Sequence, residues 1–76
     1  METLRVNCLG KSFGIGKGLR FDLLEDGESV GNTFSVDEII DTTGMKVYSE
    51  MLGKVVGMFK IQQFVEMIEI GEIVVL

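Results

Sequence analysis

The 76-residue sequence has no histidine, proline, tryptophan or alanine, and only one cysteine. Without histidine the chain lacks the usual general base near neutral pH and the commonest metal ligand. The single cysteine, Cys8, cannot form an internal disulfide, and we expect it to be a small buried hydrophobic residue in a reducing compartment. These absences argue against most hydrolase and zinc mechanisms, so we expect no enzyme activity, no cofactor and no metal site.

The sequence also lacks a secretion leader and a long apolar run. Its first residues show no basic region followed by an apolar stretch, and charged or amide side chains interrupt the apolar C-terminal third. We therefore expect a soluble, cytoplasmic protein without membrane contact. The hydrophobic fraction of 46% is too high for a disordered segment, so residues 1–76 should fold as a single domain. Because a chain this short buries only about 60% of its unfolded surface, a homodimer is favoured.

Acidic residues are concentrated in one stretch, although the formal net charge is only −5. Residues 1–21 carry four basic side chains and one acidic side chain, whereas residues 22–41 carry acidic side chains and no basic one. The candidate partner-binding residues are Asp22, Glu25, Asp26, Glu28, Asp37, Glu38 and Asp41. A surface formed by them would repel nucleic acid and attract a basic protein. The alternative is a solvated face that serves only solubility.

The N-terminal half predicts antiparallel strands. Alternating apolar residues favour strands over 3–9 and 19–25, and the glycine-rich stretch 10–18 between them is expected to be a loop. Asp26-Gly27 is typical of a tight hairpin turn. A third strand then extends from Glu28 to about Phe34. Gly31 and Asn32 within this strand indicate a bulge.

The sequence after Phe34 predicts helices. Ser35 and Glu38 match a capping box, which favours a helix that begins at Val36 and ends before Gly44. Apolar spacing favours a second helix over 45–57, although the same residues also fit a hairpin that turns at Leu52-Gly53.

The last third of the chain predicts one further helix and a strand. Ile61, Phe64, Val65 and Ile68 have the spacing of an amphipathic helix. The final strand is expected to be buried on both faces, by pairing with the first strand or with its own copy across a two-fold axis. The expected dimer interface is Ile73, Val74, Val75 and Leu76. The fold class is therefore α+β, with an N-terminal hairpin or meander, two or three short helices and a C-terminal strand.

Two motifs resemble known binding elements without completing them. Gly10-Lys11-Ser12 is similar to the end of a phosphate-binding loop, but Arg5 occupies the position where the pattern requires its first glycine. An anion held by this loop is still an alternative function. A helix over 60–70 could follow a break as in a DNA-reading motif, but its Lys60 is outnumbered by Glu66 and Glu69. Direct binding to nucleic acid is therefore not expected.

The spacing of the acidic residues suggests one functional class. Asp26 and Glu28, two apart on a strand, would lie about 6.6 Å apart, which is close to two steps of about 3.4 Å along a DNA strand. In size and charge pattern the chain resembles the small acidic proteins, many encoded by phages, that mimic DNA and inhibit DNA-binding proteins. The resemblance implies a non-enzymatic protein-binding or inhibitory module with a basic partner. The alternative is a structural or assembly module that oligomerises through its C-terminal segment.

Overall fold

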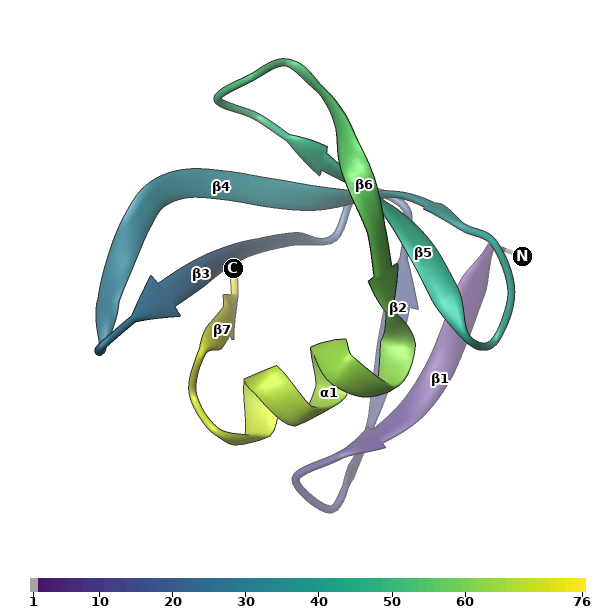
Figure 1. Ribbon diagram of the computed structural model, residues 1–76. Coiled ribbons are helices and arrows are strands. Elements are labelled where there is room, and N and C mark those ends of the chain that lie inside the picture. Colours follow the sequence, from purple (N-terminus) through teal and green to yellow (C-terminus); the bar gives the residue numbers. More distant parts are fainter. Residues whose placement is uncertain (1) are drawn as a thin grey trace.

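The computed structural model describes residues 2–76 and consists mainly of antiparallel strands (Figure 1). The elements in chain order are β1 (Thr3–Cys8), β2 (Lys11–Gly16), β3 (Arg20–Glu25), β4 (Glu28–Ile39), β5 (Gly44–Ser49), β6 (Lys54–Lys60), α1 (Ile61–Glu69) and β7 (Ile73–Val75). A five-stranded sheet has the order β6-β5-β4-β3-β7, and β1 and β2 form a separate two-stranded sheet. Because residues 2–76 contain a single helix, the predicted α+β class with two or three helices is wrong.

The glycine-rich stretch 10–18 is largely a strand, so the expected loop is wrong. Leu9 and Gly10 have φ values of 54° and 77°, as the two central residues of a tight hairpin turn require. β2 then pairs with β1 along its whole length. Its inward-facing Ile15 is fully buried in the core, which stabilises the strand despite its two glycines.

The β3–β4 hairpin confirms the expected turn and bulge. Asp26 and Gly27 have φ values of 52° and 82°. The register of β3 with β4 shifts between Asp22 and Leu24, opposite the segment that contains Gly31 and Asn32. Gly31 also has a positive φ of 82°, which explains why glycine suits this irregular position.

β4 continues to Ile39, so the helix predicted from Ser35 and Glu38 is wrong. Its alternate residues Val36 and, beyond a bulge, Ile39 are buried, and β3 and β5 pair with opposite edges of the strand. This pairing on both sides satisfies the backbone groups that a capping box would otherwise satisfy locally. A straight strand of twelve residues would span about 36 Å. The longest principal axis of the molecule extends over 27 Å, and Figure 1 shows that β4 is bent.

The region 45–57 forms the β5–β6 hairpin, so the predicted second helix is wrong and the hairpin alternative is confirmed. Gly53 lies in the turn with a φ of 68°. Met45 and Val47 of β5 are buried. The register shifts between Val47 and Tyr48, where Val56 is the extra residue of β6.

The predicted C-terminal helix is confirmed as α1, which lies under the arch of the bent sheet (Figure 1). Phe64 of α1 is fully buried, and its ring lies 5.0 Å from that of Phe21 and 5.9 Å from that of Phe59. The helix therefore brings β3 and β6 into one aromatic core. No helix within residues 2–76 has the length and apolar character needed to cross a membrane.

The final strand forms as β7, but the expected pairing with the first strand and the expected burial on both faces within this chain are wrong. β7 pairs with β3 rather than with the N-terminal strand. Ile73 is buried, whereas Val74 and Leu76 are 44% and 59% exposed. One face of β7 therefore lies on the core while the other is open.

Candidate protein-interaction site

The outer edge of β6 is the longest apolar strand edge that the described residues leave unpaired. β6 pairs only with β5, and six of its seven residues are exposed. The exposed residues include Val55, Val56 and Met58, of which Met58 is 62% exposed. β1 and β2, each six residues long, also have an unpaired outer edge, but their outward-facing residues are mainly polar or charged. β6 thus offers free backbone donors and acceptors next to apolar side chains.

An apolar groove of about 230 Å³ lies beside this edge. It forms because the bent sheet brings β6 opposite β3 and β4, as the ring contact of 6.5 Å between Phe59 and Phe21 indicates. The lining residues are Leu23, Phe34, Val47, Val56, Gly57, Met58 and Phe59. A strand placed along β6 could direct alternate side chains into this groove.

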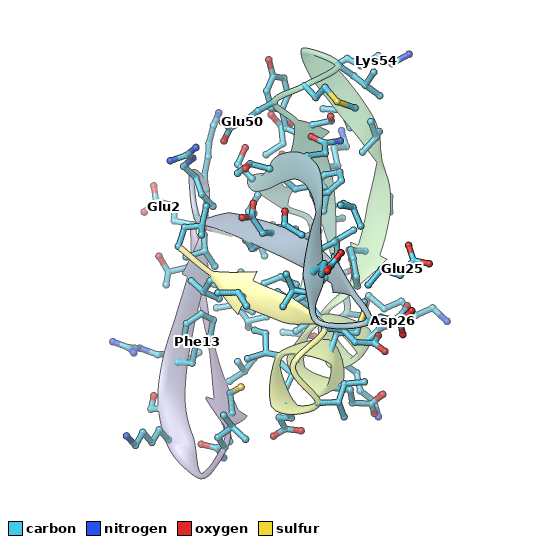
Figure 2. The ribbon with its side chains drawn as sticks, turned by 90° about the vertical axis from the view of Figure 1, so that its left-hand side faces the viewer. Glu2, Phe13, Glu25, Asp26, Glu50 and Lys54 are labelled. Atoms are coloured by element: carbon cyan, nitrogen blue, oxygen red, sulfur yellow. The ribbon has the colours of Figure 1, made fainter. Side chains whose placement is uncertain are left out.

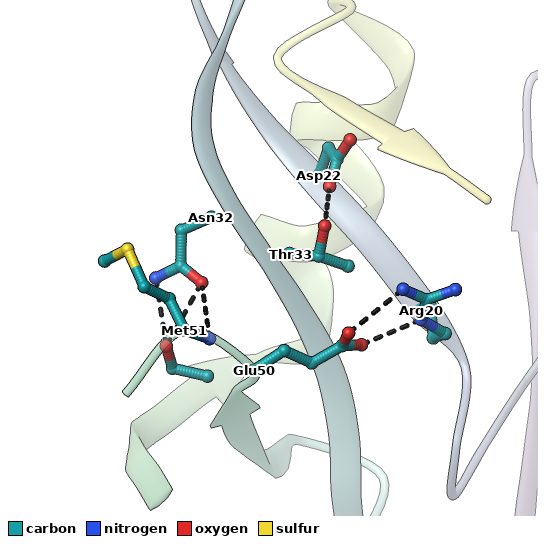
Figure 3. A network of polar contacts seen from close by, with 7 residues as sticks. Arg20, Asp22, Asn32, Thr33, Glu50 and Met51 are labelled. Carbon is teal, nitrogen blue, oxygen red and sulfur yellow. Dashed lines mark hydrogen bonds and ion pairs between the residues drawn. The ribbon is translucent and has the colours of Figure 1, made fainter. Parts of the chain in front are cut away.

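A polar network holds the β5–β6 turn against β4 (Figure 3). The hydroxyl of Ser49 is fully buried and donates to Asn32 Oδ1 at 3.1 Å. The same hydroxyl accepts from Asn32 Nδ2 at 3.0 Å and from the Leu52 amide at 3.1 Å. The Met51 amide also donates to Asn32. Because these bonds fix the turn, they also fix the start of β6.

An ion pair strengthens the same attachment (Figure 3). Arg20 Nε and Nη2 donate to the two carboxylate oxygens of Glu50 at 2.8 and 3.0 Å. The hydrogen bond from Arg20 lowers the pKa of Glu50 below its ordinary value, and the same bond raises the pKa of Arg20. Both groups are exposed to solvent, so the pair adds little to the free energy of unfolding and serves mainly to fix the position of the turn relative to β3.

The structure divides the predicted acidic surface into separate groups. Glu25, Asp26 and Glu28 lie at the tip of the β3–β4 hairpin, and we refer to these three residues as the acidic tip. Figure 2 shows Glu25 and Asp26 projecting from this tip, well away from Lys54 at the start of β6. Neither ion pair of the described residues involves the acidic tip.

The other predicted acidic residues lie away from the tip and are mostly engaged. Asp22 accepts a hydrogen bond of 2.7 Å from Thr33 Oγ1. At the far end of β4, Asp37 and Glu38 share a hollow with Lys17, and Glu38 also lies 3.5 Å from Lys46 Nζ.

Asp41 stabilises its own turn. Its carboxylate accepts from the hydroxyl and amide of Thr43 at 2.6 and 2.7 Å and from the Gly44 amide at 3.1 Å. The bond from the Thr43 hydroxyl is the main cause that lowers the pKa of Asp41. The seven predicted residues therefore do not form one continuous charged surface.

The predicted dimer residues line a second hollow. An open groove of about 660 Å³ lies between the β1–β2 hairpin and the α1–β7 segment. Its walls include Phe13, Ile68, Ile73, Val74 and Val75. Leu76 is exposed at the end of the chain. The β7 edge beside this groove is only three residues long, so it offers a much shorter hydrogen-bonding ladder than β6.

Cys8 is buried at the end of β1, as the sequence predicts. Burial raises the pKa of its thiol, and the nearby Glu69 carboxylate adds to the effect. Within residues 2–76, no three cysteine or acidic side chains group closely enough to hold a metal ion. No family model, curated protein or solved structure matches this chain.

The apolar edge was not found by sequence reasoning. The helix favoured over 45–57 includes Val55 and Val56, whose spacing suggested burial on one face, and Met58 lies outside every predicted element. The signal that could have revealed the edge is Gly53 between two stretches that each alternate, together with the lysines at 54 and 60.

Proposed function

We propose that this chain is a non-enzymatic protein-binding module that binds an extended segment of another protein along the outer edge of β6. The observation that carries this proposal is an exposed seven-residue edge strand bearing Val55, Val56 and Met58. Soluble proteins usually protect such edges with charges, prolines or covering loops, because an open apolar edge pairs with other chains. β6 carries charges only at its two ends, Lys54 and Lys60, and Val55, Val56 and Met58 between them are uncovered. An edge left open beside an apolar groove is typical of strand addition.

Strand addition would use both features of the site. The backbone of β6 would supply hydrogen bonds that any extended segment can make, and these would account for affinity. The groove between β6 and the β3–β4 pair would select apolar side chains at alternate positions of the bound segment. The network around Ser49 and Asn32 would keep β6 in place before binding, which lowers the entropic cost of association.

Binding to an array of synthetic ten-residue peptides tests this proposal. The double variant Val56→Lys/Met58→Lys should lose at least tenfold in affinity for the peptides that bind the unmodified protein. Leu9→Lys/Val30→Lys adds the same charge at residues that are 66% and 48% exposed, and it should bind normally. Equal binding by both variants, or no binding of alternating apolar peptides by the unmodified protein, would contradict the proposal.

A second candidate function is binding of a basic protein through the acidic tip. It is favoured by the absence of any ion pair at Glu25, Asp26 and Glu28 among the described residues. DNA mimicry would be one form of it. Glu25→Gln/Asp26→Asn/Glu28→Gln should then abolish salt-sensitive binding to a histone-like protein and leave the fold intact, because Asn-Gly also suits the turn. Unchanged binding by this variant would exclude the tip.

We also propose a cytoplasmic location. The support is compositional: the chain has one cysteine and cannot form an internal disulfide. A fluorescent fusion expressed in cells and fractionated into soluble, membrane and secreted material would test this location, and recovery outside the soluble fraction would contradict it.

A further inference from the structure

We infer that the segment bound along β6 has apolar residues at alternate positions and a carboxylate near each end. This inference rests on the proposed function and names the chemistry of its partner. The evidence is the pair of lysines that begin and end β6, Lys54 and Lys60. Both side chains are exposed, and neither takes part in the ion pairs of residues 2–76, which join Arg20 to Glu50 and Lys46 to Glu38.

The lysines frame the apolar part of the edge. Because Val56 is an extra residue of β6, β5 spans the stretch from Lys54 to Lys60 in five residue steps, from Ser49 to Gly44, which correspond to about 17 Å, and the two lysines lie on opposite faces of the sheet. Val55, Val56 and Met58 lie within this interval. A partner strand running alongside would bring its residues opposite Lys54 and Lys60 within about 5 Å of them. Carboxylates at two positions five residues apart, which project from opposite faces of a regular strand, would therefore complement both lysines, while apolar residues between them face the groove.

A second copy of this chain fits the same edge poorly. The register that pairs all seven residues of β6 with its own copy in antiparallel fashion sets Lys54 directly opposite Lys60 of the other copy. Like charges directly opposite each other destabilise a sheet, and this register would contain two such pairs. Any other register between two copies of β6 would pair fewer residues and form fewer backbone hydrogen bonds. The charges thus favour an acidic partner segment over a homodimer at this edge.

The experiment compares two labelled peptides by fluorescence anisotropy. The first is Glu-Val-Thr-Val-Thr-Glu with blocked ends, and the second has lysine in place of each glutamate. We expect the unmodified protein to bind the glutamate peptide about tenfold more tightly, because two exposed charge pairs change from attraction to repulsion. The double variant Lys54→Glu/Lys60→Glu should reverse this preference.

A matched variant separates local pairing from overall charge. Lys11→Glu/Lys17→Glu changes the net charge equally on the β1–β2 side of the molecule and should keep the preference for the glutamate peptide. Equal affinity of the unmodified protein for the two peptides would overturn the inference but leave the proposed function standing. Failure of both peptides to bind would overturn both.

Backbone amide exchange tests the alternative occupant. In the free protein the outer amides of β6 should exchange at rates independent of protein concentration, and the glutamate peptide should protect them. Protection that rises with protein concentration in the absence of peptide would overturn the inference, because it would show that a second copy occupies the edge.

Discussion

At the scale of single residues, a few polar side chains determine where β6 begins. Ser49 is the one fully buried polar residue of the described chain, and Asn32 satisfies its hydroxyl while also accepting from the following turn. Arg20 and Glu50 attach the same turn to β3. The position of the proposed binding edge thus depends on polar contacts made at the β5–β6 turn.

Replacing Glu50 should change how stability depends on pH. The folded-state pKa of Glu50 is lowered, so its contribution is present above the unfolded value of about 4.3 and is lost as pH falls through the folded value. We expect Glu50→Gln to lower the unfolding temperature at pH 7 and to match the unmodified protein near pH 2. Thermal denaturation followed by circular dichroism from pH 7 to pH 2 would show this, and a constant difference would contradict it.

Removing the amide of Asn32 should destabilise the fold. Asn32→Ala leaves the buried Ser49 hydroxyl without its side-chain partner, at a cost of about 1–3 kcal/mol. Urea denaturation would measure the change. Asn7→Ala, at an exposed position on β1, is the control and should alter the free energy of unfolding by less than about 0.5 kcal/mol. Equal effects at the two positions would show that the network adds no stability.

At the scale of elements, the two sheets have different means of support. The five-stranded sheet pairs every strand with a neighbour, whereas β1 and β2 pair only with each other. A two-stranded hairpin is marginally stable alone, so it depends on packing against the rest of the molecule. That packing is provided by Ile15, which belongs to the common hydrophobic core, and by the partly buried Leu4, Val6 and Phe13, which pack against it.

Shortening Ile15 should loosen the hairpin before the rest of the molecule. We expect Ile15→Ala to cost about 2–5 kcal/mol and to speed amide exchange in β1 and β2 more than in β4 and β5. The same substitution at Ile40, which is 41% exposed, should have a small effect. Uniform acceleration of exchange in both sheets would instead show that they unfold as one unit.

At the scale of the whole molecule, charge and apolar surface are separated. The β1–β2 hairpin carries Arg5 and Lys11, the acidic tip lies on the β3–β4 hairpin, and the open apolar edge belongs to β6. A net charge of −5 keeps copies apart at long range. The exposed edge is then the surface through which copies would associate when the protein is concentrated or heated.

Charging this edge should reduce aggregation. Val56→Lys/Met58→Lys places two cations on β6, and we expect slower growth of light scattering on heating than for the unmodified protein. Leu9→Lys/Val30→Lys changes the net charge equally and should have less effect, because Leu9 lies in a turn and Val30 in the irregular part of β4. The same reduction in both variants would assign the effect to net charge alone.

Local patterns predicted some elements correctly and failed at others for a consistent reason. Residues 3–9, the Asp26-Gly27 turn and the helix around Phe64 depend on alternation, turn chemistry or helical spacing that neighbouring residues supply. The helix expected after Ser35 failed because pairing with β3 and β5 outweighs a capping signal. The acidic residues were found, but their grouping was not, since the bend of β4 and the bond between Asp22 and Thr33 depend on strand pairing and not on neighbouring residues.

The sequence by itself determined the small size, the single cysteine, the excess of acid and the site of the Asp26-Gly27 turn, because these follow from composition and from the dihedral preferences of individual residues. Only the tertiary structure decided that residues 44–60 form a hairpin with an open apolar edge and that the acidic residues are divided. Strand pairing joins residues far apart in the chain, so its outcome depends on which edges the whole fold leaves uncovered.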